Sequence, residues 1–139
     1  MTMLNLETSH TNEQCHAWHV RFNDALVARD VDLYLAFFRD DCTLQINSAM
    51  PTYSKRALEA AYRRHLASFR TMTYEIMNIV GDVRKSSCET LYTFNCYDGR
   101  TEVIQCTYLV DLDDAGLICS VRIYGNGGRV FKEFMRASG

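Results

Sequence analysis

One stretch of the sequence decides the fold: residues 88–124, CETLYTFNCYDGRTEVIQCTYLVDLDDAGLICSVRIY. β-Branched and aromatic residues dominate three runs within it, and that composition is typical of strands. Asp98-Gly99 separates the first two runs and Asp113-Asp114-Ala115-Gly116 the last two, and both segments are hairpin signals. The stretch therefore predicts an antiparallel meander, with strands over Cys88–Tyr97, Thr101–Leu112 and Leu117–Tyr124.

The Asp98-Gly99 turn also predicts which side chains share a face. As a two-residue turn it pairs Tyr97 with Arg100 and places Asn95 opposite Glu102. One face then carries Leu91, Thr93, Asn95, Glu102, Ile104, Cys106, Tyr108 and Val110, joined by Cys119, Val121, Ile123 and Gly125 if the second turn is tight. The opposite face carries Tyr92, Phe94, Cys96, Val103, Gln105, Thr107, Leu109, Ser120, Arg122 and Tyr124. Because both faces carry apolar side chains, we expect helices on one face and a second subunit on the other, as a homodimer.

Helical periodicity comes before the meander. Apolar residues recur at helical spacing over Asn12–Ala28, Asp30–Phe38 and Ser54–Phe69, and two further strands are predicted over Cys42–Ile46 and Thr71–Val80. Helices followed by strands, without β-α-β alternation, predict an α+β domain whose helices pack on one face of a curved sheet. We expect this single domain to span residues 1–139, with residues 1–11 and 127–139 as peripheral tails.

Composition and charge exclude several classes of protein. The 139 residues carry a formal net charge of -2, and no basic run is longer than a pair, so a nucleic-acid surface is not expected. No apolar stretch approaches the ~18 residues of a membrane span, and the polar N-terminus lacks the features of a signal peptide. We therefore expect a cytoplasmic protein that binds neither nucleic acid nor membrane.

The cysteines and histidines do not predict a metal site. The six cysteines are irregularly spaced without a C-x-x-C pair, which favours reduced thiols packed in a core. His16 and His19 are three residues apart, but no facing carboxylate completes a ligand set. Neither a metal nor a cofactor is expected.

The order of these elements resembles the nuclear-transport-factor-2-like superfamily, and within it the SnoaL-like polyketide cyclases and ketosteroid isomerases. The resemblance is carried by FNDAL at residues 22–26, ARDVD at residues 28–32 and FFRDDCT at residues 37–43. It implies a cone-shaped α+β fold, in which a curved antiparallel sheet wraps around N-terminal helices and encloses a deep pocket. Members of this superfamily catalyse isomerisation, cyclisation, dehydration or epoxide hydrolysis, and others only bind partners.

Carried over by position, the resemblance argues against ketosteroid isomerisation. The family's general-base aspartate falls at Ile46, which cannot take a proton, and its oxyanion-hole tyrosine falls at Phe22, which has no hydroxyl. The oxyanion-hole acid falls at Tyr108, which can still donate a hydrogen bond, and a supporting tyrosine is retained as Tyr62.

Two other activities of the superfamily also fit poorly. The acid-arginine-acid set of limonene epoxide hydrolase would need charged residues where this chain has Asn95, Tyr97 and Ile123. A mechanism like that of scytalone dehydratase needs pocket histidines, whereas the four histidines here lie in the N-terminal tail or on predicted helices.

Five residues are candidates for chemistry. Tyr108 could hydrogen-bond an enolate or carbonyl oxygen, and Glu102 with Asn95 could supply a carboxylate and an amide near the hairpin end. His65 shares a helix face with Tyr62 and is a candidate for proton transfer. The alternatives are packing roles for Tyr108 and His65 and a solvated carboxylate for Glu102. The substrate-binding candidates are Trp18, Phe22, Ile46, Leu91, Thr93, Cys106, Val121 and Ile123.

Together these residues predict a cofactor-independent isomerase or cyclase. The resemblance implies acid-base chemistry on a small hydrophobic, oxygenated substrate of polyketide or terpenoid type, with dehydration as a variant. The alternative is a non-catalytic module of the same fold that binds a small ligand or dimerises. The absence of the family's aspartate favours the module, whereas the enzyme is favoured by Tyr62 together with Tyr108, Asn95 and Glu102.

Overall fold

The structure, a computed structural model, describes residues 2–125, and side chains from Glu13 onward. Its helices are α1 (Thr2–Val27), α2 (Val31–Leu35) and α3 (Lys55–Ala67). Its strands are β1 (Phe38–Ile46), β2 (Thr52–Tyr53), β3 (Thr71–Gly81), β4 (Lys85–Asn95), β5 (Thr101–Leu112) and β6 (Ile118–Gly125). Helix α1 includes residues 2–11, which were expected to be a peripheral tail, and the other expected tail, 127–139, lies outside the described residues.

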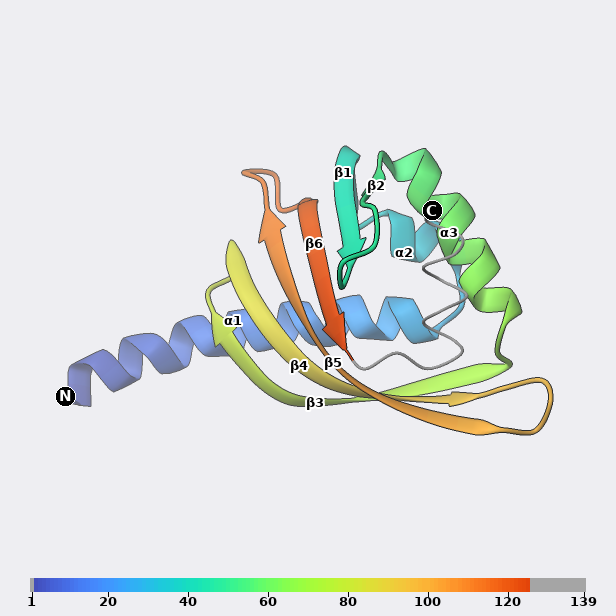
Figure 1. Cartoon of the computed structure of the whole chain (residues 1–139). Coiled ribbons are helices and arrows are strands. Elements are labelled where there is room, and N and C mark those ends of the chain that lie inside the picture. The colour runs from blue at the N-terminus through green and yellow to red at the C-terminus, as the bar shows by residue number, and fades with distance from the viewer. Residues whose placement is uncertain (1, 126–139) are drawn as a thin grey trace.

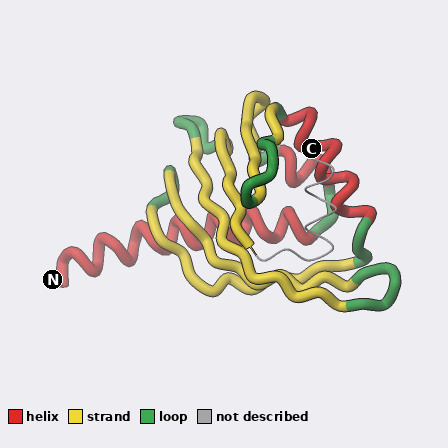
Figure 2. Tube along the Cα trace, in the orientation of Figure 1, coloured by secondary structure: helices red, strands yellow, loops and turns green. Residues whose placement is uncertain are grey.

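The six strands form one curved, open sheet in the order β2-β1-β6-β5-β4-β3. Strands β3 to β6 are antiparallel neighbours, which confirms the predicted meander, while β1 runs parallel to β6 and makes the sheet mixed. Figures 1 and 2 show the sheet curving around the helices, and α1 packs against β3 while α3 packs against β1. The predicted cone-shaped α+β fold is confirmed, and the core lies between sheet and helices.

The first hairpin differs from the prediction by one residue. The amide of Cys96 donates to the carbonyl of Arg100 (2.9 Å), and the amide of Gly99 donates to the carbonyl of Cys96 (3.1 Å). The loop is therefore three residues long, and Gly99 takes its left-handed position with φ at +88°. Consequently Asn95 pairs with Thr101 rather than with Glu102.

This shift reverses the predicted faces of β4. A slip of one residue moves every side chain of a strand to the other side of the sheet. Tyr92 and Phe94 are therefore buried on the concave face, and Leu91 and Thr93 belong to the convex face. The residues predicted for the concave face of β5 are correct from Ile104 to Val110, and so are Val121 and Ile123 on β6. A bulge in the pairing of these two strands takes Cys119 off that face.

Capping residues set the bounds of the shorter helices. The Asp30 side chain accepts from the amide of Leu33 at the start of α2, and the Ser54 side chain accepts from the amide of Ala57 at the start of α3. The prediction that the second helix reaches Phe38 is wrong, because Phe38 already begins β1 and pairs with Ile118.

All six cysteines are free, and five are buried, which confirms the prediction of thiols packed in a core.

None of the helices in the described part of the chain combines the length and apolar character needed to cross a membrane.

Candidate functional site

A cavity lies between the concave face of the sheet and helices α1, α2 and α3. The space between its lining atoms measures about 560 Å³, part of it open to solvent. This figure includes open solvent, so it is not the volume of a closed ligand cavity. Its described lining consists of Phe22, Leu26, Tyr34, Ile46, His65, Met72, Tyr92, Phe94, Cys106, Tyr108, Val121 and Ile123.

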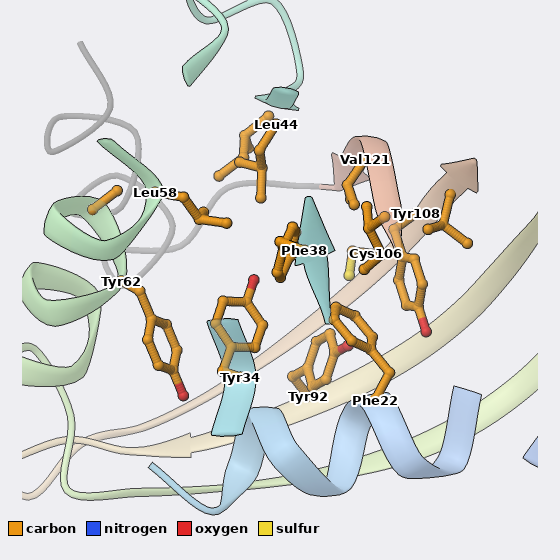
Figure 3. Close-up of a cluster of buried hydrophobic side chains, with 14 of the residues drawn as sticks. Phe22, Tyr34, Phe38, Leu44, Leu58, Tyr62, Tyr92, Cys106, Tyr108 and Val121 are labelled. Carbon is orange, nitrogen blue, oxygen red and sulfur yellow. The ribbon is translucent and has the colours of Figure 1, made fainter. Parts of the chain in front are cut away.

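Seven of the residues predicted for the site line this cavity. They come from five elements: α1, β1, α3, β5 and β6. Figure 3 shows four of these residues, Phe22, Cys106, Tyr108 and Val121, within the surrounding hydrophobic cluster. The seven are Phe22, Ile46, His65, Cys106, Tyr108, Val121 and Ile123. Two predicted catalytic candidates, Tyr108 and His65, are thus placed on one cavity.

Glu102 and Asn95 are not brought together at the cavity, contrary to the prediction. Glu102 pairs with Phe94, and its carboxylate accepts from Arg100 Nη1 at 2.6 Å beside the hairpin loop. The Asn95 side chain is exposed; it donates to Thr71 Oγ1 and accepts from Thr101 Oγ1. The physical reason is the three-residue loop, which turns Asn95 to the convex face.

The remaining predicted residues lie away from the cavity. Tyr62 is fully buried, but its hydroxyl donates to the carbonyl of Leu26 (2.8 Å) and so anchors the end of α1. Trp18 lies behind Phe22, with the two rings stacked at 5.2 Å, and does not itself line the cavity. Leu91 and Thr93 point to the convex face, as the corrected register requires.

A buried hydrogen-bonded network lies where α1 meets the sheet. Asn23 is its centre: Nδ2 donates to the carbonyl of His19 (2.9 Å) and to the Tyr108 hydroxyl (2.9 Å), and Oδ1 accepts from the Tyr92 hydroxyl (2.5 Å). His19 Nδ1 lies 2.7 Å from the Tyr108 hydroxyl, and Nε2 lies 2.8 Å from Ser86 Oγ. The network therefore holds two phenols of the cavity in place.

Burial keeps these groups uncharged. It lowers the pKa of His19 to about 4, with His16 adding to the effect, and it lowers the pKa of His65 to about 3, with Arg29 adding to it. Burial also raises the pKa of Tyr108 well above its ordinary value, and Tyr92 and Cys88 raise it further. The site at neutral pH is thus a set of neutral hydrogen-bonding groups in an apolar cavity.

Tyr34 is the third phenol of the cavity. Its side chain is 4% exposed and stacks on Tyr62 with ring centroids 4.2 Å apart. Burial is the largest cause that raises the pKa of Tyr34 above its ordinary value, and the nearby Tyr62 and Cys42 raise it further. Figure 3 shows Tyr34 and Tyr92 in one cluster with Phe22.

The sequence analysis missed four of these residues. His19 and Asn23 lie one helical turn apart on α1, and this spacing was a signal for a shared face. Tyr34 lies on the short helix that follows its Asp30 cap. Tyr92 was assigned to the opposite face by the two-residue turn, and a three-residue loop ending at Gly99 would have placed it correctly.

The described lining of the cavity contains neither a carboxylate nor an arginine. Among the described lining residues, the groups that can exchange a proton or hydrogen-bond a ligand are imidazole, phenol and thiol. A charged substrate would also find no counter-charge among these lining residues, so the cavity suits a neutral, largely apolar ligand.

A family model described as SnoaL-like domain matches residues 19–121 of the chain. No curated protein sequence matches the chain. The matched range includes the network residues of α1 and most of the meander.

Several solved structures share the fold at low sequence identity. PrhC from Penicillium brasilianum NBRC 6234 is 13% identical with a TM-score of 0.75, over 91% of this chain and 89% of that one. AusH from Aspergillus nidulans is 15% identical with a TM-score of 0.73, over 85% of this chain and 87% of that one. An LEH-like epoxide hydrolase from M. tuberculosis is 21% identical with a TM-score of 0.69, over 92% of this chain and 93% of that one.

Proposed function

The chain belongs to the SnoaL-like domain family, and on that premise we propose that it is a cofactor-independent isomerase or cyclase. Its substrate is a small, neutral, hydrophobic molecule that carries oxygen, of the polyketide or terpenoid type. The reaction is acid-base chemistry next to a carbonyl group. The single observation that carries this proposal is the buried network that fixes Tyr108 at the apolar cavity.

The network supports the proposal because five buried polar side chains are costly to keep in the core of a small domain. Such groups are tolerated when each finds a partner, and they then hold one another rigidly. Here the partners of Tyr108 are His19 and Asn23. Groups fixed in this way can stabilise charge that develops in a transition state without first reorganising.

Tyr108 is the proposed proton donor to the substrate oxygen. In the tautomer that carries the proton on His19 Nδ1, the Tyr108 oxygen accepts from both His19 and Asn23 Nδ2, and its own proton can turn from the Cys88 sulfur to the substrate. As that proton moves to the substrate oxygen, the two donors stabilise the phenolate that forms. Ser86 lies at His19 Nε2 and holds the ring in this orientation.

His65 is the proposed base that removes a proton from the substrate carbon while Tyr108 donates to the oxygen. Its neutral imidazole lines the cavity and can take the proton that leaves a carbon next to the carbonyl. The protonated imidazole is disfavoured by burial, so the proton is returned to another carbon or to the oxygen. Removal and return of a proton at different atoms moves a double bond, which is an isomerisation.

Tyr108→Phe is expected to lower the rate of proton exchange by ~100-fold, because general acid groups contribute ~100-fold or more. The measurement is uptake of deuterium from D2O at carbons next to the carbonyl, followed by NMR over a panel of cyclic ketones and enones. Deuterium uptake reports enolisation of any panel member that the cavity accepts, so the readout does not depend on the identity of the natural substrate.

The matched control for this measurement is Tyr53→Phe. Tyr53 is 63% exposed on β2 and has no place at the cavity, so its loss should leave exchange unchanged. Equal exchange by Tyr108→Phe and the unaltered protein would contradict the role given to Tyr108. Exchange no faster than in buffer for the whole panel would contradict the proposed enzyme.

A non-catalytic ligand carrier is the second candidate function. One observation favours it: the described lining lacks a carboxylate, the usual general base next to a carbonyl. Saturable binding of panel members without exchange would support the carrier. Epoxide hydrolysis, suggested by the M. tuberculosis neighbour, gains no support from a lining without charged groups.

We also propose that the chain is a cytoplasmic homodimer formed through the convex face of the sheet. Val103 and Tyr124 are exposed there, at 57% and 44%, although both are large apolar side chains on central strands. Exposed apolar surface of this kind marks association sites. The free thiols agree with a reducing compartment.

Val103→Lys is expected to convert the dimer to the 16.0 kDa monomer, because it places like charges against each other across a symmetric interface. Light scattering coupled to size exclusion measures the mass directly. Tyr53→Lys, on β2 at the sheet edge, is the matched control and should leave the mass unchanged. A monomer in the unaltered protein would contradict the proposed dimer.

A further inference from the structure

A line of hydrogen-bonding groups leads from the Tyr108 hydroxyl away from the cavity. The hydroxyl lies 2.7 Å from His19 Nδ1, and Nε2, on the opposite edge of the same ring, lies 2.8 Å from Ser86 Oγ. All three side chains are buried. Their polar atoms therefore connect the cavity wall on β5, through α1, with the beginning of β4, and each step is a hydrogen-bond distance.

The far end of this line lies beside solvent. Ser86 lines a second hollow, which is open to solvent and shares no lining residue with the cavity at Tyr108. Lys85, Asp111 and Arg122 also line the hollow, so its wall is polar enough to hold water. Ser86 is therefore the member of the line that can exchange a proton with water.

The neighbours of Ser86 decide where its proton points. Its hydroxyl also interacts with the thiol of Cys15, which donates to the carbonyl of Asp82 at 3.5 Å and whose sulfur is a weak acceptor. The imidazole nitrogen at 2.8 Å is the stronger acceptor, so the Ser86 proton faces His19 Nε2. The single ring proton of the neutral imidazole is then on Nδ1, where it faces Tyr108.

We propose that Ser86 and His19 form a proton relay between solvent and Tyr108. When Tyr108 gives its proton to the substrate, its phenolate takes the proton of His19 Nδ1, Nε2 takes the proton of Ser86, and Ser86 takes a proton from water in the hollow, which leaves hydroxide there. The same transfers run outward, back to the hydroxide, when the enol returns its proton to Tyr108. This inference rests on the proposed role of Tyr108 as proton donor and adds how that donor is recharged.

The relay agrees with the neutral state of His19. Burial lowers the pKa of His19 to about 4, so a ring that had to hold two protons would be disfavoured. In the relay, Nε2 gains a proton as Nδ1 loses one, and the ring carries a single proton before and after the transfer. Imidazole suits this task because its two nitrogens can accept and donate at opposite edges.

The test follows the exchange of the His19 ring proton with water by NMR, in the full chain without ligand. Saturation transfer from water to isotope-labelled histidine gives the exchange rate of the ring N–H resonance that His19→Gln removes. Ser86→Ala is expected to lower this rate at least about tenfold, because a buried N–H without the relay exchanges only when the fold opens locally. Ser86→Thr keeps a hydroxyl and should retain the rate to within about threefold.

Ser87→Ala is the matched control. Ser87 is the next residue of β4 and lines the same hollow, but its side chain belongs to the convex face, away from His19. Its loss should leave the exchange rate of the His19 ring proton unchanged. Circular dichroism checks that each variant keeps its fold.

Two results would overturn the relay. One needs no variant: exchange of the His19 ring proton in the unaltered protein that is no faster than its global unfolding. The other is an equal exchange rate in Ser86→Ala and the unaltered protein. Either result with Tyr108-dependent deuterium uptake intact would leave the proposed function standing. Ser86-dependent exchange without deuterium uptake by any panel member would support the relay and contradict the proposed enzyme.

Discussion

Replacing Asn23 by leucine is expected to lower the free energy of unfolding by about 3–5 kcal/mol. The change deprives the Tyr92 hydroxyl of its acceptor and the Tyr108 hydroxyl of a donor, and both lie buried. A buried polar group left without a partner costs about 1–3 kcal/mol, and a 139-residue domain has only about 5–15 kcal/mol in total. Urea denaturation followed by circular dichroism measures the difference.

The double variant Asn23→Leu, Tyr92→Phe is the control for this prediction. Removing the Tyr92 hydroxyl together with the amide that accepts from it should recover part of the lost stability, because replacing both partners of a hydrogen bond by apolar groups is less costly than leaving one unpaired. A double variant as unstable as the sum of its single changes would show that Asn23 acts by shape and not by its hydrogen bond to Tyr92.

Acidification from pH 7 to pH 4.5 is expected to destabilise the protein by roughly 5 kcal/mol through His19 and His65. Their pKa values are lowered to about 4 and about 3 in the folded protein, against about 6.5 in the unfolded chain. Between these values the unfolded chain binds more protons, so stability is complete above pH 6.5 and falls as the pH drops. Each histidine contributes about 2–3 kcal/mol over this window.

Urea denaturation at pH 7.0, 5.5 and 4.5 measures the slope of the free energy of unfolding against pH. His19→Gln and His65→Gln should each flatten it by about one proton, whereas His16→Gln, at an exposed position of α1, should not. Identical slopes in the unaltered protein and in the His19→Gln, His65→Gln double variant would show that these histidines are not buried in neutral form. The same result would weaken the proposed role of His65.

These predictions connect the stability of the domain to its site. The residues that make the cavity usable for acid-base chemistry are also those whose burial is expensive: two neutral histidines and three phenols.

Much of the architecture follows from local sequence. The β-branched runs of residues 88–124 and their two turns predicted the meander, and helical spacing with the caps Asp30 and Ser54 predicted the helices. These features depend on neighbours in the chain, which a sequence displays directly. The same patterns placed Tyr108, Cys106, Val121 and Ile123 correctly on the concave face.

Tertiary structure decided the composition of the site. The choice between a two-residue and a three-residue loop at Asp98-Gly99 exchanges Leu91, Thr93 and Asn95 for Tyr92 and Phe94 on the concave face. Both loops suit the local sequence, so burial of Tyr92 and Phe94 against the helices selects one of them.

The network has the same origin. Residues 19, 23, 86, 92 and 108 come from three separate elements, and no spacing along the chain brings these three elements together. The sequence alone determined an α+β cone with Tyr108 and His65 as candidates for chemistry. Only the packing of α1 across the sheet decided which buried partners hold Tyr108, because these contacts join residues far apart in the chain.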